Sequence, residues 1–286
     1  MAVLLGLCVA VVYGTADFLG GRTSRAVPAA VVVAGSQLTG LALVVVLVVV
    51  DGAPPATLRA LAFGAASGVV GMIGARLLYR GLAVGAMGVI APVTAIGAAI
   101  VPVTYGIATG ERPSGPALVG IALALVAVAL IAGGLAPADP VRPLVPGHGR
   151  TSPRELLLAG LAGGAFGVGF ILLAEAGEGS GFWPVLAARA ASTPVALLAL
   201  GAAGHRFALP RGSRLAVAAA GALDAAAIAL YLLASRQGLL SLVAVLGSLY
   251  PAATVLLARL VLHERFVRSQ LLGLVAALVA VVLIAR

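Results

Sequence analysis

Gly120–Ala132 reads GIALALVAVALIA, and Gly273–Ala285, which begins 153 residues later, reads GLVAALVAVVLIA. Nine of these thirteen positions are identical. Further residues pair at the same offset: Glu111 with Glu264, Arg112 with Arg265, Gly14 with Gly167, and Tyr13 with Phe166. A strongly apolar unit that occurs twice is typical of secondary transporters, in which the substrate site lies between two repeats.

The composition is that of a chain that lies in lipid. Hydrophobic residues make up 62% of the sequence and charged residues only 9%, whereas about a quarter of the residues of soluble domains are charged. A length of 286 residues allows about ten membrane crossings of ~20 residues each, with short connections. We therefore expect an all-α integral membrane protein.

Side chains that could serve catalysis, metals or nucleic acids are few. All 18 basic residues are arginines, spread singly along the chain, which favours topology signals over a nucleic-acid surface. Cys8 is the one cysteine, so a disulfide within the chain and a multi-cysteine metal site are excluded. The common hydrolase and metalloprotease signatures and a nucleotide-binding loop are also absent from the sequence. We predict no cofactor, no metal, no nucleic-acid partner and no enzymatic activity.

Clusters of arginine, proline and glycine divide the chain into ten apolar runs. The predicted spans are 2–21, 27–50, 57–80, 85–109, 114–135, 155–175, 182–203, 213–236, 239–262 and 267–285. The longest polar interruption, Pro137–Pro153, contains five prolines and separates two sets of five spans. We predict a first five-helix repeat at 1–135, a linker at 136–153 and a second five-helix repeat at 154–286. An odd number of spans in each repeat would insert the two in opposite orientations, as inverted repeats.

The arginines that flank the spans predict the orientation of the chain. Eleven lie on the side that holds Arg22 and Arg142, and four lie on the side that holds Arg59 and Arg286. Because cytoplasmic loops carry the excess of basic residues, we expect both termini outside the plasma membrane.

The last two spans carry a pattern of polar residues and glycine around apolar runs. In order, its residues are Tyr250, Pro251, Glu264, Arg265, Gln270 and Gly273. This order resembles the Pro, apolar run, Gly-Glu-Arg, Gln, Gly stretch of the EamA-type family in the drug/metabolite transporter superfamily. His263 replaces the glycine of that stretch.

The first repeat extends the resemblance. The matching residues are Gly110, Glu111, Arg112 and Gly120, and the aromatic-glycine pair Tyr13 and Gly14 of the first span. In the second repeat, Arg189 of the seventh span fits the family's arginine in the second span of a repeat. Ala98 stands where the family has its proline. The resemblance implies ten spans in two five-span repeats, a central cavity formed by spans 1–4 and 6–9, and transport of small molecules of diverse chemistry.

Asp224 is the most informative charged residue, because it lies in the middle of the apolar run LAVAAAGALDAAAIALYLL. An unpaired charge at that depth is costly, so such residues usually face the bundle interior and mark a pathway. Arg76 lies in the equivalent span of the first repeat. We therefore predict that Asp224 and Arg76 face one cavity and pair in at least one state, either for function or as a structural ion pair.

The other candidates are weaker. Asp17, near the end of the first span, could line the cavity, reach the interface, or pair with Arg22 or Arg25. Arg189 has no charged neighbour in sequence and needs a partner or an anionic ligand. Tyr13 and Tyr231 complete the set of cavity candidates.

Two acid-arginine pairs, Glu111 with Arg112 and Glu264 with Arg265, end the fourth span of each repeat. They could lock the turn between spans, or they could be salt bridges and helix-end charges at the membrane surface.

Taken together, these features predict a secondary active transporter that exports a small metabolite, amino acid or drug-like molecule by alternating access, driven by protons through Asp224 or Asp17. Its expected partners are a small-molecule substrate, membrane lipid and a second copy of the chain in a homodimer. The alternative is a membrane scaffold or partner subunit that transports nothing.

Overall fold

The computed structural model describes residues 1–24, 26–84, 87–133, 152–262 and 267–286. Every regular element in these ranges is helical. The elements are α1 (Ala2–Ser24), α2 (Ala29–Asp51), α3 (Leu58–Val84), α4 (Met87–Ala108), α5 (Gly115–Gly133), α6 (Pro153–Ala174), α7 (Trp183–Ala202), η1 (Arg211–Ser213), α8 (Arg214–Ser235), α9 (Leu240–Gly247), α10 (Tyr250–Leu262) and α11 (Arg268–Ile284). The predicted all-α class is confirmed.

Each predicted apolar run contains a helix at nearly the expected place. Seven of the described spans are long and apolar enough to cross a membrane, and three shorter apolar helices lie at 93–108, 115–131 and 268–284. Many large hydrophobic side chains stay exposed, including Val50, Leu58 and Leu215 at 74% or more. Exposed apolar surface of this extent is suited to lipid, and the chain is a multi-pass membrane protein.

The ninth predicted span differs from the expectation, because it is broken into two helices. α9 ends at Gly247, Ser248 and Leu249 form a turn, and α10 begins at Tyr250. The cause is Pro251, which has no N–H group and whose ring obstructs the helical bond to the carbonyl four residues earlier, at Gly247.

The second half of the chain begins with a strong helix start. Ser152 caps α6 by accepting a hydrogen bond from the Glu155 amide, and the Glu155 carboxylate accepts one from the Ser152 amide. Pro153 occupies the first turn, where its missing N–H is harmless. The predicted linker at 136–153 falls almost entirely outside the described residues.

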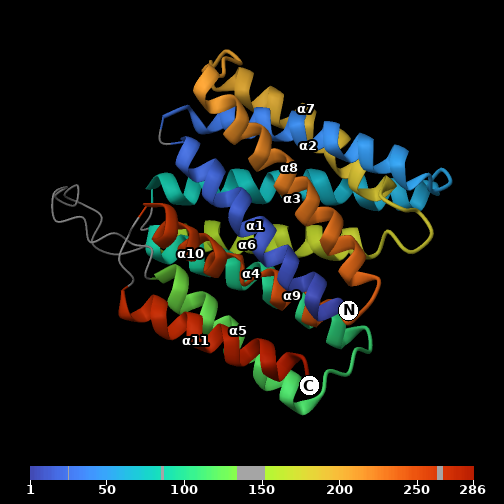
Figure 1. Ribbon diagram of the computed structural model, residues 1–286, viewed down its shortest axis with the longest axis vertical. Coiled ribbons are helices and arrows are strands. Elements are labelled where there is room, and N and C mark those ends of the chain that lie inside the picture. The colour runs from blue at the N-terminus through green and yellow to red at the C-terminus, as the bar shows by residue number, and fades with distance from the viewer. Residues whose placement is uncertain (25, 85–86, 134–151, 263–266) are drawn as a thin grey trace.

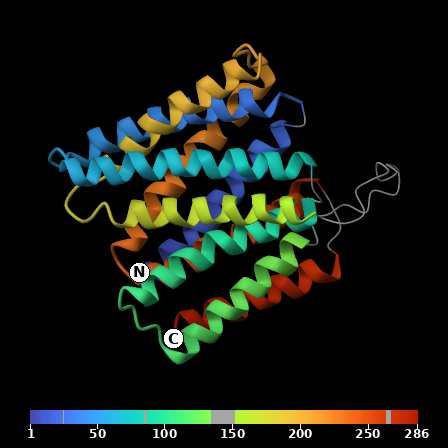
Figure 2. The same ribbon diagram turned by 180° about the vertical axis from the view of Figure 1, so that it is seen from behind.

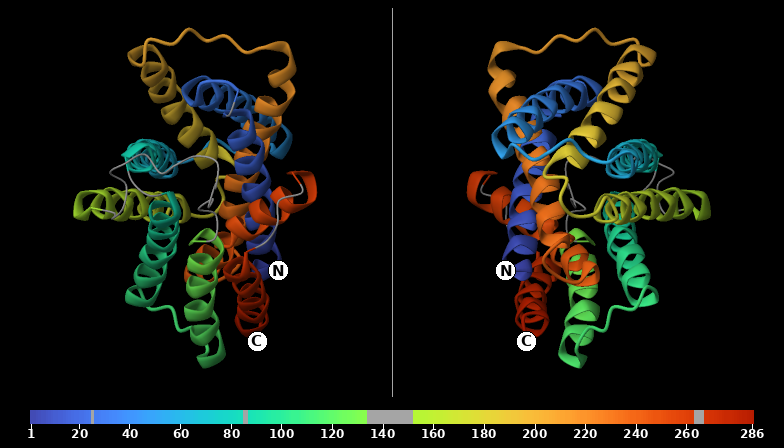
Figure 3. Two further views of the ribbon diagram at one scale, coloured as in Figure 1. Left: turned by 90° about the vertical axis from the view of Figure 1, so that its left-hand side faces the viewer. Right: turned by 90° about the vertical axis from the view of Figure 1, so that its right-hand side faces the viewer.

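Helices of the first half pack mainly against helices of the second half. α1 packs on α8 and on the α9–α10 pair, while α6 packs on α3 and α4. α2 contacts both α7 and α8, and α7 also contacts α3. α5 and α11 pack on each other at one lateral side of the bundle, opposite the side that holds α2 and α7 (Figures 1 and 2). The views in Figure 3 show the same separation.

The contact between α5 and α11 is reciprocal. A methyl group added at Gly120 would lie 2.9 Å from the Ala280 carbonyl oxygen, and one at Gly273 would lie 3.0 Å from the Ala127 carbonyl oxygen. Both contacts join residues that the 153-residue offset makes equivalent. Because the start of each helix meets the end of the other, α5 and α11 run antiparallel. Both chain ends lie at the same end of the bundle (Figures 1 and 2).

Glycines allow the helix backbones that surround the centre to touch. A methyl group at Gly68 on α3 would lie 2.1 Å from the carbonyl oxygen of Ala188 on α7. At Gly14 on α1 it would lie 2.5 Å from the carbonyl oxygen of Tyr250 on α10. Small residues at such crossings let spans pack closely in lipid, where no hydrophobic effect drives helices together.

Candidate functional site

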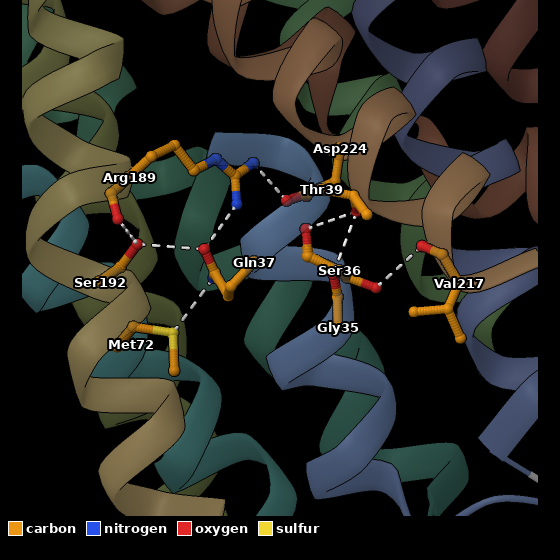
Figure 4. Close-up of polar contacts among 9 residues, drawn as sticks. All are labelled: Gly35, Ser36, Gln37, Thr39, Met72, Arg189, Ser192, Val217 and Asp224. Carbon is orange, nitrogen blue, oxygen red and sulfur yellow. Dashed lines mark hydrogen bonds and ion pairs between the residues drawn. The ribbon is translucent and has the colours of Figure 1, made fainter. Parts of the chain in front are cut away.

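The centre of the site is an ion pair between α7 and α8. Arg189 donates from Nη2 to Oδ2 of Asp224 (Figure 4). The Arg189 side chain is 3% exposed, whereas that of Asp224 is 34% exposed. A charge as deeply buried as Arg189 needs a charged partner, and Asp224 provides it.

A glutamine on α2 completes the contacts of Arg189. Nη1 of Arg189 donates to the Gln37 side-chain oxygen at 2.9 Å, and the Ser192 hydroxyl donates to the same oxygen at 3.2 Å (Figure 4). The Gln37 amide nitrogen points to the sulfur of Met72 on α3, at 3.5 Å. Four helices, α2, α3, α7 and α8, therefore meet at one polar cluster, which we call the central network (Gln37, Met72, Arg189, Ser192 and Asp224).

Two glycines bring α2 and α8 close enough to build this network. A methyl group at Gly221 on α8 would lie 2.2 Å from the Ser36 carbonyl oxygen, and one at Gly40 on α2 would lie 2.9 Å from the Gly221 carbonyl oxygen. A methyl group at Gly40 would also lie 3.5 Å from the guanidinium carbon of Arg189. Gly40 thus leaves room for the guanidinium between α2 and α8.

Several buried polar atoms near the central network have no hydrogen-bond partner among the described residues. Nε of Arg189 and the hydroxyl of Thr193 are buried and have no hydrogen-bond partner among the described residues. The hydroxyl of Tyr231 is also buried without one. Most buried polar groups in proteins are paired, and sites that bind ligands or water are a usual exception.

The predicted pairing of Asp224 with Arg76 is not the one found in this structure. Arg76 is exposed, and the partner of Asp224 is Arg189. Helix packing explains the difference: α8 packs against α2, which places Asp224 beside Gln37 and the guanidinium that Gln37 binds. Met72, which follows Gly71, the residue that the 153-residue offset aligns with Asp224, contacts the network through Gln37.

Asp17 and Tyr13 lie on the inward face of α1. Asp17 follows the buried residues Ala10 and Gly14 by seven and three positions, which places all three on one side of the helix. The exposed Val11 lies on another side, about 120° away around the helix. Asp17 is nevertheless exposed, so its carboxylate is reached from inside the bundle and not from the lipid. No ion pair joins Asp17 to Arg22, and Arg25 lies outside the described residues.

Most of the predicted cavity residues come together in space. The charges of Asp17, Arg189 and Asp224 all act on the Tyr13 hydroxyl, as does Tyr231. Tyr231 itself is 1% exposed and stacks on Phe170, with ring centroids 4.5 Å apart. Tyr231 is therefore part of the packed wall behind the network. Among the predicted cavity residues, Arg76 is the one that takes part in none of these interactions.

Of the two acid-arginine pairs predicted at the turns, the structure describes Glu111 and Arg112. The carboxylate of Glu111 accepts hydrogen bonds from the backbone amides of Leu240 and Ser241, at the start of α9. Glu111 thus caps a helix of the opposite repeat, where a negative charge is favoured. Arg112 is exposed and donates a hydrogen bond to the Glu111 carbonyl at 3.4 Å. Glu264 and Arg265 lie outside the described residues.

Sequence reasoning did not identify Gln37, Ser192 or the helix break before Tyr250. An amide well inside the apolar run AAVVVAGSQLTGLALVVV is a signal that would have found Gln37, because such groups bond across helices in membranes. Among the described residues no three metal-ligating side chains cluster. A pocket lined by Phe207, Leu209 and Arg214 lies at the α7–α8 connection.

Comparison with known proteins finds a similar family. Residues 153–286 match the model of the EamA-like transporter family. A solved structure, titled only "Crystal structure of protein", has a TM-score of 0.78 at 17% sequence identity, and the match covers 99% of this chain and 98% of that one. At that identity the likeness shows a shared fold alone. No curated protein matches the chain. The second half of this chain is therefore similar to the EamA-like transporter family of the drug/metabolite transporter superfamily.

Proposed function

We propose that the protein is a secondary transporter that exports a small metabolite, such as an amino acid or a drug-like molecule, across the plasma membrane. The observation that carries this proposal is the central network, a buried cluster of charge and hydrogen bonds well inside apolar spans. Charged groups within membrane spans usually mark a substrate or ion path. The similarity of the second half to a transporter family agrees with this function.

Alternating access through two inverted repeats, 1–135 and 154–286, is the second part of the proposal. It is supported by the antiparallel arrangement of α5 and α11, which occupy equivalent places in the two repeats and meet through Gly120 and Gly273. If both helices cross the membrane, one repeat enters it from the opposite side. Rocking of such halves about a central site is the usual mechanism of this class.

Proton coupling is the third part. Asp224, in the middle of α8, and Asp17, toward the end of α1, are carboxylates inside spans, so one of them would carry the proton. Asp224 is paired with the Arg189 guanidinium in this structure. A coupling role for Asp224 therefore requires that the pair opens during the cycle, when Gln37 and the substrate would bind the guanidinium.

Reconstitution into liposomes tests these parts together. The purified protein is given a pH gradient and a panel of labelled amino acids and amines, and we expect accumulation that a protonophore abolishes. Asp224→Asn should abolish uphill accumulation but leave exchange of labelled for unlabelled substrate. Glu178→Gln, which changes an exposed carboxylate of the α6–α7 connection, is the control and should leave both processes unchanged.

The remaining outcomes are also informative. Undiminished uphill transport in both Asp224→Asn and Asp17→Asn would rule out coupling at these carboxylates. If no hydrophilic solute crosses the bilayer under any gradient, the proposed transport is wrong and a scaffold or partner subunit is the better explanation.

A further inference from the structure

Asp17 is a carboxylate that has no counter-ion among the described residues. It is exposed on the inward face of α1, and no hydrogen bond or ion pair joins it to any described residue. The charge that acts on it most directly is that of another acid, Asp224. Because Arg189 already neutralises Asp224, the surroundings of Asp17 keep a net negative charge.

Two tyrosine rings flank this carboxylate. Tyr13 precedes Asp17 by four residues, one turn along the same face of α1. Tyr250, at the start of α10, lies opposite, with the ring centroids 6.4 Å apart and the planes tilted by 53°. The charge of Asp17 acts on the hydroxyls of both tyrosines. Both rings are only partly buried.

The arrangement is held by close packing of the two helices. Gly14, next to Tyr13, lets the backbone of α1 approach that of α10, since a methyl group there would lie 2.5 Å from the Tyr250 carbonyl oxygen. The Thr254 hydroxyl donates to the Gly14 carbonyl at 3.1 Å. The helix break at Ser248 and Leu249 places Tyr250 at a helix start. The backbone segments that carry the two rings are therefore held close together.

We propose that Asp17, Tyr13 and Tyr250 form a subsite for the ammonium group of the transported molecule. An accessible carboxylate attracts a cation, and the faces of aromatic rings stabilise an alkylammonium ion whose charge is spread over its carbon atoms. An anion would be repelled by Asp17, whose charge no described arginine neutralises. This inference rests on the proposed transport function and assigns the substrate class as organic amines and quaternary ammonium ions.

Binding to the purified full-length protein tests the subsite without requiring transport. The probes are choline, tetramethylammonium and phenethylammonium, each compared by calorimetry with a neutral molecule of the same shape, such as 3,3-dimethyl-1-butanol for choline. We expect at least one ammonium probe to bind at least about ten-fold more tightly than its neutral counterpart. Failure of all three to do so overturns the proposal.

Substitutions locate the binding. Asp17→Asn should weaken it by about ten-fold or more, since the opposite charge is lost. Tyr13→Leu and Tyr250→Leu should each weaken it by about five-fold, and Phe at either position should weaken it less because the ring remains. Glu178→Gln is the charge-matched control and should change nothing.

A folding defect is separated from a binding defect by Asp17→Glu, which keeps the charge and should bind within a few-fold of the natural protein. Ammonium binding that is unchanged in Asp17→Asn overturns the assignment. Transport of neutral or anionic metabolites without ammonium binding would overturn the subsite and leave the transport function intact. Asp17-dependent ammonium binding without any flux would support the subsite and contradict transport.

Discussion

Replacing Asp224 with alanine should be among the most destabilising single changes in this protein. The change leaves the Arg189 guanidinium 97% buried, with the neutral oxygen of Gln37 as its remaining acceptor. Removal of one partner from a buried ion pair typically costs about 3–5 kcal/mol, because the other charge stays buried and uncompensated. We expect the lower end, about 3 kcal/mol, because Gln37 keeps one hydrogen bond to the guanidinium.

The reverse change should cost less. Arg189→Ala leaves Asp224, whose side chain is 34% exposed, so solvent can hydrate its charge. We expect about half the effect, roughly 1.5 kcal/mol. In the double variant neither charge remains, so its destabilisation should fall short of the sum of the single effects by at least about 1.5 kcal/mol.

Unfolding of the purified protein in mixed micelles, titrated with a denaturing detergent, measures these free energies. Arg76→Ala provides the matched control, since Arg76 is an exposed arginine in the span equivalent to that of Asp224. Its effect should be small and should add to that of Asp224→Ala within about 0.5 kcal/mol. Asp224→Asn should fall between the natural protein and Asp224→Ala, because an asparagine oxygen still accepts from Arg189.

Two results would refute this reasoning. If the effects of Asp224→Ala and Arg189→Ala simply add, the two side chains do not interact in the folded protein. If Asp224→Ala couples to Arg76→Ala instead, the pair predicted from the sequence is the dominant one.

Two further predictions concern the packing around the network. Glu111→Ala should destabilise the protein by about 2 kcal/mol, since two amides at the start of α9 lose a charged acceptor. The neighbouring change Arg112→Ala is the control and should be nearly neutral in the same unfolding assay. Equal effects of the two changes would show that the cap is unimportant. Gly68→Ala should cost about 1–3 kcal/mol because its new methyl group would meet the Ala188 carbonyl oxygen at 2.1 Å. Gly71→Ala on the same helix meets nothing within 4 Å and should be neutral or slightly stabilising; a comparable loss at both glycines would argue against the tight α3–α7 contact.

The order and length of the helices follow from the sequence alone. In lipid every backbone polar group must be paired within its own segment, so a run of about 20 apolar residues has few alternatives to a helix. Proline and arginine mark where the runs end, and the helix start at Ser152 and Pro153 agrees with that reading. The duplicated segments at Gly120 and Gly273 likewise identify two equivalent helices, because residue identity at a constant offset is a property of the chain and needs no tertiary information.

Which side chains meet is decided by tertiary structure. Asp224 lies 35 residues from Arg189, and nothing local to either residue distinguishes Arg189 from Arg76 as its partner. The choice depends on Gly40 and Gly221, which let α2 and α8 touch and so place Gln37 beside the guanidinium.

The same holds for the other contacts of the site. The carboxylate of Glu111 finds its amides 129 residues away, on a helix of the other repeat. Asp17 is equally suited by its sequence position to the interface or the interior, and only the packing of α1 shows which of its faces is covered. A sequence specifies where charges lie along each helix, but the rotation and crossing of the helices, set by small residues in contact, determine which charges face each other.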